Sequence, residues 1–436
     1  MKLADNLFDR HRARIVLCVL AASAFAGCGS EPPLAVGNSD LSQFSAQSEL
    51  IAKLAFRKSA YPVGSQNAQI AHAVMNNTTR VASADLWAAE LRVMAATKNW
   101  LPGIRPSLSL DGLGAMVAQI AVEQVLFDNG RRKALRDVAW AELEVAAVEV
   151  SIDANKRVHD ALSLWVEAVY NAKEAAVAED AVLRMSALAD VVAVRSDSGY
   201  GDPGDGSIIM LRLAEMRDRQ DSFSRRQARA LAELELLAGR HPEALSGADE
   251  KIELGEVEGL ALLSVLRATA ERDRIVAEAR ASRAAFLPRL GITGQMNRAD
   301  GESRSDITLL AGSEGVLGLG TGNAIAAQNA KITVAERTLL QAQEDASRSM
   351  LRVSADLAEI EASFNQVDKL IAMANGSASL YLEQFREGRR SIVEVIGGFE
   401  TLWAMQSRKS QLWAEAEQVR LVLGRDLGVL VDGSEL

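Results

Sequence analysis

The chain has 436 residues with 48 Lys or Arg and 58 Asp or Glu, which gives a formal net charge of −10 at pH 7. An acidic chain without a cluster of basic residues is a poor binder of nucleic acid, so that class of partner is excluded. Its four histidines are scattered, which excludes a His-based metal cluster and argues against a Ser-His-acid catalytic arrangement. We therefore expect no enzyme activity, no metal and no cofactor.

The first 27 residues indicate a bacterial export signal. A basic start precedes a short apolar run from Ile15 to Ala26, which is too short to cross a bilayer. The following Phe25-Ala26-Gly27-Cys28 resembles a lipobox, although that motif usually opens with Leu. This predicts cleavage before Cys28 and attachment of lipid to it; an ordinary cleavable signal with an incidental cysteine is the alternative. In the lipoproteins that it resembles, Gly29 in place of Asp favours sorting to the outer membrane.

Removal of the signal would leave one cysteine and no intrachain disulfide, so the stability of the mature chain must come from packing. Four basic and two acidic residues leave with the signal, which takes the net charge from −10 to −12. No later segment has 18 consecutive apolar residues, so any crossing of a membrane must use strands. Residues 28–66 are expected to form an extended, lipidated N-terminal segment.

The rest of the chain contains one motif twice. Leu101-Pro102 recurs as Leu287-Pro288, and Leu237-Ala238-Gly239 recurs as Leu427-Gly428, at offsets of about 186 to 190 residues. Such a duplication predicts two similar halves. The predicted boundaries are a first half at 67–239, a connection at 240–259, a second half at 260–428 and a C-terminal tail at 429–436.

Each half is expected to contain a helix, a Leu-Pro stop, a pair of strands, a very long helix, a turn and a returning helix. In the first half these are a helix at 67–100, a strand pair within 103–127 around Gly112-Leu113-Gly114, a long helix at 131–195 and a returning helix at 208–238. In the second half they are a helix at 260–286, a strand pair within 289–319 (strands 289–297 and 307–317 around a polar loop), a long helix at 323–387 and a returning helix at 392–427.

The long helices are predicted from heptads. A helix of about 65 residues rises about 97 Å at 1.5 Å per residue. The helices at 208–238 and 260–286 together nearly match this length, and so do those at 392–427 and 67–100. We therefore predict rods two helices wide, in which the shorter partners meet midway. In the second long helix the apolar residues that stand seven apart are Ile325, Ile332, Leu339, Ala346, Val353, Ile360, Val367, Ala374 and Tyr381.

The strands have roughly the 9 to 11 residues of a tilted strand in an outer-membrane barrel. Four strands cannot close a barrel. Either several chains contribute strands to one barrel, or the four strands form a small soluble sheet.

The order and spacing of these features resemble the TolC-type outer-membrane channel family over essentially the whole mature chain. The likeness is carried by Leu-Pro before each first strand, by Leu126-Phe127-Asp128-Asn129-Gly130 at the entry to a long helix, and by the segment from Phe385 to Val395 at the second turn. The resemblance implies a mainly α fold with a small β part. It further implies a homotrimer in which four strands per chain complete a 12-stranded barrel in the outer membrane, while long antiparallel helical hairpins form an α-barrel in the periplasm.

The resemblance also implies an aperture near the second turn, held closed by ion pairs and ringed by carboxylates. By position in the motif, Arg390 matches the basic residue that locks the tip and Glu394 matches one aperture carboxylate. Three copies of Glu394 would favour cations in a narrow mouth. The ring would be thinner than the usual pattern, because Gly397 and Met210 stand at two related positions. The alternative for Arg390 and Glu394 is a solvated charged pair on an exposed turn.

The first turn, from Ser196 to Gly206, is longer and more acidic than the tight turn of the family. Its aspartates could suggest a calcium loop, but the bidentate Glu that completes such a loop is missing, so a flexible tip loop is the better interpretation. His159 lies in heptad register with Ile152 and is interpreted as a helix-packing residue. The glycines from Gly318 to Gly322 lack the Lys of a phosphate loop and are interpreted as a junction between strand and helix.

The predicted function is a passive exit duct in the outer membrane, lipid-anchored and reaching into the periplasm. It would serve a tripartite efflux pump or a type I secretion system, with a periplasmic adaptor and an inner-membrane transporter as partners. A periplasmic adaptor and a structural coiled-coil lipoprotein are the alternatives. Small molecules, metals and proteins can all leave through such ducts, so the sequence leaves the cargo open.

Overall fold

A computed structural model describes residues 44–62, 64–77, 81–110, 116–199, 202–239, 261–299, 302–315 and 318–436. The predicted signal peptide, Cys28 and the whole connection at 240–259 lie outside these residues. The described chain is mainly helical with one small antiparallel sheet, as predicted. Its α-helices are α2 Glu49–Ala55, α3 Gln66–Asn76, α4 Val81–Thr97, α5 Arg131–Asp197, α6 Pro203–Ala238, α7 Leu263–Ala285, α8 Thr321–Arg386 and α9 Ile392–Leu427, and a 3-10 turn, η2, spans Gly433–Glu435.

The two long helices, α5 and α8, have 67 and 66 residues and each rise about 100 Å. The start of α5 is set by the motif singled out in the sequence. Asn129 and Gly130 adopt left-handed conformations with φ of 52° and 80°, and the Asp128 carboxylate accepts hydrogen bonds from the amides of Gly130 and Arg132. The Asn129 side chain also donates to the carbonyl of Pro288, at 2.6 Å. The entry to the first long helix is thereby tied to the Leu-Pro stop of the second half.

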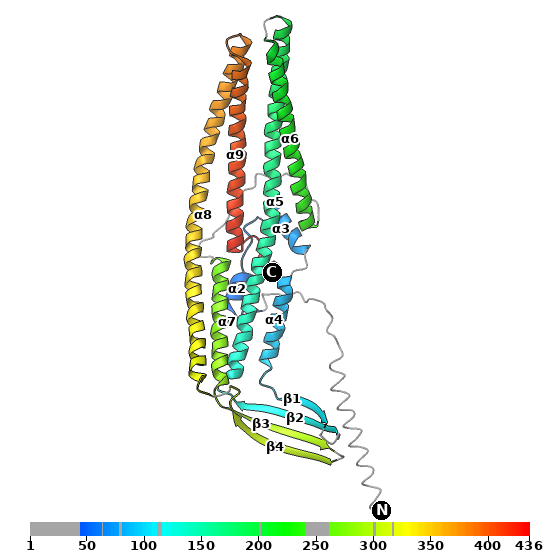
Figure 1. Cartoon of the computed structure of the whole chain (residues 1–436), viewed down its shortest axis with the longest axis vertical. Coiled ribbons are helices and arrows are strands. Elements are labelled where there is room, and N and C mark those ends of the chain that lie inside the picture. Colours follow the sequence, from blue (N-terminus) through cyan, green and yellow to red (C-terminus); the bar gives the residue numbers. More distant parts are fainter. Residues whose placement is uncertain are drawn as a thin grey trace, which may run out of the picture. The chain divides into compact units, whose positions relative to one another are not determined.

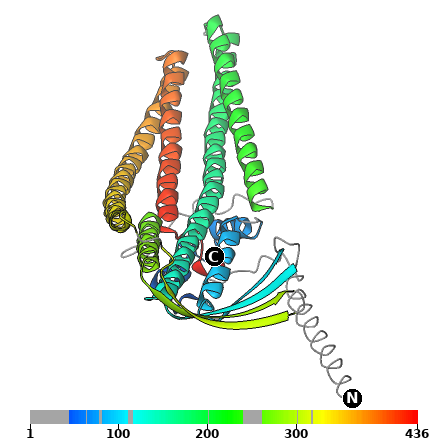
Figure 2. The ribbon, with the colours of Figure 1, turned by 60° about the horizontal axis from the view of Figure 1, so that its bottom comes forward.

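Each long helix pairs with a returning helix and with shorter helices beyond it (Figures 1 and 2). α5 packs against α6, α7, α9 and α4, whereas α8 packs against α9 and α7. The predicted order of the shorter partners is wrong. α6 ends beside α3 and α9 ends beside α7, so each column of short helices stays within one half of the sequence. The summed lengths of the short helices could not distinguish the two pairings, because the short helices of the two halves are similar in length.

The helix predicted at 67–100 is also wrong as a single element. The structure has α3, ending with Asn77 as its C-cap, and a separate α4 that begins at Val81. Asn76 and Asn77 at the end of α3 supply a physical reason, because Asn is a weak helix former.

The strands form one sheet in the order β1-β2-β3-β4, with every neighbouring pair antiparallel. The central pair, β2 with β3, joins the two halves of the sequence and has an irregularity between Val125 and Phe127. β4 begins and ends five residues earlier than predicted, because the polar residues assigned to a loop continue the pairing, as between Arg304 and Asn297. The strand bounds are β1 Gly103–Leu110, β2 Met116–Phe127, β3 Arg289–Ala299 and β4 Glu302–Gly312.

The core follows α5 along its length. Leu143, Leu162 and Leu188 are each almost fully buried, and each belongs to a different apolar cluster along the helix. The cluster that contains Leu188 joins α5 and α6 with α8 and α9 near the hairpin tips. α5 is therefore the helix around which the other elements pack.

The segment around Arg57 and the C-terminal residues meet at the middle level of the helices. The buried Arg57 guanidinium donates to the carbonyl of Leu427 at the end of α9 and, at 2.8 Å, to the carbonyl of Ala261 before α7. Burial lowers the pKa of Arg57 to about 10, so the side chain stays charged at neutral pH. The Gly433 amide donates to the Arg57 carbonyl, and a Cβ at Gly433 would lie 2.3 Å from the Leu54 carbonyl oxygen. The C-terminal residues are thus locked against the N-terminal segment.

Candidate functional site

The second hairpin tip contains both residues that the sequence assigned to an aperture. α9 begins with a capping box, in which the Ser391 hydroxyl accepts from the Glu394 amide and the Glu394 carboxylate accepts from the Ser391 amide. The hydrogen bonds that the Glu394 carboxylate accepts from the Ser391 amide and hydroxyl lower its pKa, and the nearby Arg390 charge adds to the effect. Gly388, with φ of 76°, provides the left-handed residue that the turn requires.

Arg390 makes three contacts, all within the hairpin formed by α8 and α9. Its Nη1 donates to Glu394 at 2.9 Å, its Nε donates to Gln384 at 2.6 Å, and its guanidinium lies 3.7 Å from the centre of the Tyr381 ring. The structure thus brings Arg390 and Glu394 together as an ion pair. Among the described residues, Arg390 has no partner on the hairpin formed by α5 and α6. Within one chain this pair stiffens one tip and does not connect the two.

The connection between the tips comes from a residue that sequence reasoning missed. Arg195, in the last turn of α5, donates to the carbonyl of Phe385 near the end of α8, and its guanidinium lies 4.6 Å from the Phe385 ring. Two further contacts join the first hairpin to the second below the tips. The Arg184 guanidinium of α5 lies over the Phe399 ring of α9, and the Arg212 guanidinium of α6 lies 3.5 Å from the Glu400 carboxylate of α9. An Arg in the last turn of a helix usually interacts with the C-terminal carbonyls of that same helix, so the sequence position of Arg195 does not predict a contact with the other hairpin.

Beneath these charges the tips share an apolar cluster. Val192 of α5, Ile209 of α6, Phe385 of α8 and Ile392 of α9 are all buried in it. The two hairpin tips of one chain therefore lie side by side and at the same level.

The first tip differs from its prediction. α6 begins at Pro203, five residues earlier than predicted, because Asp202 caps it by accepting from the Gly204 amide at 2.8 Å and Pro203 suits the first helical position. Burial and the neighbouring Asp202 raise the pKa of Asp205. Within the described part of the chain, no group of three His, Cys, Asp or Glu side chains is placed to hold a metal ion. Met210, the counterpart of Glu394, is 59% exposed.

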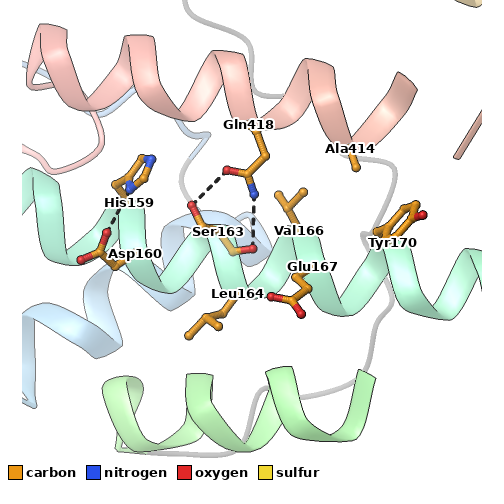
Figure 3. A pocket seen from close by; sticks show the side chains of 9 residues that line it. All are labelled: His159, Asp160, Ser163, Leu164, Val166, Glu167, Tyr170, Ala414 and Gln418. Atoms are coloured by element: carbon orange, nitrogen blue, oxygen red, sulfur yellow. Dashed lines mark hydrogen bonds and ion pairs between the residues drawn. The ribbon is translucent and has the colours of Figure 1, made fainter. Parts of the chain in front are cut away.

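An open pocket between α5 and α9 contains His159 (Figure 3). Its Nδ1 lies 3.1 Å from Asp160, and its Nε2 is buried with no hydrogen-bond partner among the described residues. The Ser163 hydroxyl, one turn further on, donates to Gln418 and not to His159. The pocket therefore contains no paired nucleophile and base, and the His159 ring packs between helices as interpreted from the heptads.

The glycine-rich segment before α8 is a junction between strand and helix, as interpreted. The Gly318 amide donates to the Thr321 hydroxyl at 2.9 Å, and α8 begins at Thr321.

None of the helices in the described ranges combines the length and the apolarity needed to cross a bilayer.

The sequence matches no protein-family model and no curated protein. The fold matches solved outer-membrane channels. VceC of Vibrio cholerae is 14% identical with a TM-score of 0.71 and covers 83% of this chain and 96% of its own. The open MtrE channel of Neisseria gonorrhoeae is 14% identical with a TM-score of 0.70, covering 84% and 90%. A membrane protein of Pseudomonas aeruginosa is 15% identical with a TM-score of 0.71, covering 84% and 91%.

These likenesses establish the fold. The chain has the fold of TolC-type outer-membrane channels, which confirms at the level of fold the resemblance carried by its repeated motifs.

Proposed function

We propose that this chain is the subunit of a passive exit duct in the outer membrane, of the kind used by efflux pumps. The observation that carries the proposal is the combination of two helices, each about 100 Å long, with a small sheet at the end remote from the hairpin tips (Figure 1). This arrangement suits a protein that spans a distance between a membrane and a partner in the next compartment. The channel fold supports the proposal.

The duct would be a homotrimer. The outer edges of β1 and β4 have no paired strand among the described residues, so the sheet of one chain is open. Three copies would supply 12 strands, enough for a barrel with a wide interior. Large apolar side chains stand exposed on the edge strands, including Ile104, Leu108, Ile307 and Leu309, which are 67% to 85% exposed. Lipid would cover such residues in a barrel.

The finer assignments belong to the same proposal. Residues 1–27 would be removed as a signal, Cys28 would carry the lipid anchor, and the two halves at 67–239 and 260–428 would each contribute one hairpin and two strands. Arg390 and Glu394 would act at the aperture, with one Glu394 from each subunit facing the passage. A periplasmic adaptor and an inner-membrane transporter, of an efflux pump or a type I secretion system, would deliver the substrate to the tips.

The test is reconstitution of the purified protein. We expect trimers in detergent, migration on gels that changes on heating, fractionation with the outer membrane and single-channel conductance in planar bilayers. A protein that stayed monomeric and gave no conductance would refute the duct. An extended rod without membrane association would instead support a structural coiled coil.

A further inference from the structure

The places where the chain passes between the sheet and the helices expose large apolar side chains. Trp100 before β1 and Phe127 at the end of β2 are 64% and 55% exposed. Leu287 before β3 is 47% exposed, and Leu319 before α8 is fully exposed. Connections of this kind usually consist of Gly, Pro, Asn, Asp and Ser. These four apolar residues form what we call the junction collar.

The junction collar continues the apolar face of the sheet. Phe127 pairs with Leu290, and Ile292, two residues further along β3, pairs with Leu309. Paired residues, and residues two apart on one strand, lie on the same face of a sheet, so these four side chains share one face. In the proposed barrel this is the face that lipid would cover. The collar therefore lies where that face meets the helices.

Three unpaired basic side chains lie next to the collar. Lys98 directly follows α4, and Lys133 and Arg136 belong to the first two turns of α5. All three are exposed, and none has an ion-pair partner among the residues that the structure describes. The Asn99 side chain donates to the Arg132 carbonyl at 3.0 Å, which holds the end of α4 against the start of α5. The three charges thus lie on neighbouring helix ends.

The basic residues at the start of α5 do not stabilise the helix itself. Positive charge at this end opposes the helix dipole, and the first turn of α5 contains no acidic residue. Arg131 is compensated by Glu314, at 2.6 Å. Arg132 lies 3.9 Å from Asp128, whereas Lys133 has no ion-pair partner in the described ranges. Residues 131–140 include four basic and one acidic side chain, a net charge of +3 in a chain of −10. This surface is therefore suited to a negatively charged partner.

The positive surface lies on the side of α5 that the N-terminal segment follows. The Phe44 ring packs edge-on against Trp140, with 5.9 Å between ring centres. Arg136 and Lys133 stand four and seven residues before Trp140, so the three side chains share one stripe of the helix. Phe44 follows Cys28, the residue proposed to carry lipid, by 16 residues, which span at most about 58 Å. The segment that would carry the anchor thus meets α5 on the same stripe as the two basic residues.

From these observations we infer that Lys98, Lys133 and Arg136 bind the phosphate groups of anionic phospholipids in the membrane leaflet next to the helices. The junction collar lies in the headgroup region, which is about 5 to 7 Å thick and favours aromatic side chains. Lys133 and Arg136 stand about 5 and 9 Å along α5 from Gly130, and their long side chains can extend toward the phosphates. The inference rests on the proposed duct and adds the class of lipid that surrounds its helix-side rim.

The lipid preference of the reconstituted protein tests this inference. The purified protein is placed in phosphatidylcholine vesicles with a trace of spin-labelled lipid, either phosphatidylglycerol or phosphatidylcholine. Electron paramagnetic resonance then measures the fraction of each label that the protein immobilises. We expect phosphatidylglycerol to be held about threefold more than phosphatidylcholine at low salt, and about equally in 1 M NaCl, where the Debye length is about 3 Å. A variant with Lys98→Gln, Lys133→Gln and Arg136→Gln should lose the preference.

Two control variants separate charge at this surface from net charge and from folding. The first removes three exposed basic residues from α6, which begins at the first tip and ends beside α3. Its substitutions are Arg217→Gln, Arg219→Gln and Arg225→Gln. The second keeps every charge beside the collar, with Lys98→Arg, Lys133→Arg and Arg136→Lys. Both controls should keep the threefold preference, because the charge beside the membrane is unchanged in each.

The outcomes separate this inference from the proposed function. A preference that survives in the glutamine variant beside the collar, or in 1 M NaCl, would overturn the inference. Loss of the preference in either control variant would overturn it as well. A trimeric, conducting protein that holds both lipids equally would overturn the inference and leave the duct standing. A protein that immobilises neither lipid and does not conduct would overturn both.

Discussion

The two long helices are nearly equal in length and both carry heptads, yet their surroundings differ. α5 has 24 buried residues among 67, whereas α8 has five among 66. α5 lies among α6, α7, α9 and α4, whereas α8 packs mainly against α7 and α9 and reaches α5 through Phe385 at the tips. The heptad pattern therefore reports that a helix has one packed face and does not report how many further faces are covered within the chain.

This difference indicates that α5 mainly stabilises the fold of a single chain, whereas α8 has surface left for the association of chains. The buried face of α5 includes Asn155, Asn171 and Glu174 beside its apolar residues. The packing of α5 within the chain therefore depends on polar contacts as well as on the fit of apolar side chains. α8 keeps Leu351 and Met373 exposed where a second copy could cover them. We expect substitutions in α5 to change the stability of the chain itself, and substitutions at these exposed positions of α8 to change the association of chains.

The largest effect is expected for Leu162→Ala in α5. Leu162 is 1% exposed in the central cluster, and truncation of such a leucine costs about 3 kcal/mol of the free energy of unfolding. The measurement is urea unfolding followed by circular dichroism. Leu351→Ala on α8 is the matched control, and its effect should appear in the trimeric fraction more than in the unfolding of the helices. Equal losses of helix stability in both variants would remove the distinction between the two helices.

Asn155→Ala extends the test of α5 to a buried polar position. The Asn155 side chain is fully buried, donates to the Ser151 carbonyl at 2.8 Å and accepts from the Leu430 amide at 2.9 Å. Its loss leaves a buried amide without an acceptor and should cost about 1 to 3 kcal/mol in the same urea experiment. The exposed Asn375 of α8 is the control, and Asn375→Ala should change the free energy of unfolding by less than about 0.5 kcal/mol. A neutral Asn155→Ala would show that water or rearrangement replaces the lost bond.

Arg195→Ala tests the polar contact between α5 and α8 at the tips. The substitution removes a hydrogen bond to a helix C-terminal carbonyl and a stacked cation, together worth about 1 to 2 kcal/mol. We expect the tips to separate more easily, seen as higher conductance in bilayers and greater sensitivity of cells to large antibiotics. Arg184→Ala, whose charge lies further from its ring at 5.9 Å, should have a smaller effect. Unchanged conductance in Arg195→Ala would show that the apolar cluster alone holds the tips.

Much of this comparison could be predicted from the sequence. The heptads of α8 mark its packed face correctly, since Val367 and Ala374 are buried and Ile332 and Leu339 are half-buried. The capping sequence at Ser391 likewise gives the start of α9 correctly. Such features depend on neighbours three to seven residues away, which the sequence displays directly.

Other features depend on contacts that the sequence does not display. The pairing of α6 with α3 rather than α7, and the contact of Arg195 with Phe385, join residues separated by more than 150 positions. The early start of β4 is similar, because Arg304 becomes part of a strand only through its pairing with Asn297. A polar residue in a strand and a polar residue in a loop have the same appearance in sequence.

The smallest effect is expected at Glu394, which belongs to the same tip but is exposed and contacts only its own hairpin. Its pKa is lowered by the capping hydrogen bonds, so the ionised form stabilises the folded tip above the ordinary pKa of a glutamate, and this contribution is lost as pH falls through the lowered value. Acidification to about pH 3 should therefore loosen the second tip, measured as greater mobility of a spin label at Glu387→Cys. Glu394→Gln retains an acceptor for the cap but cannot ionise, so its label mobility should lose this pH dependence. If the variant and the parent responded alike, the charge of Glu394 would have no part in holding the tip, and the Arg390 pair would be a solvated surface contact.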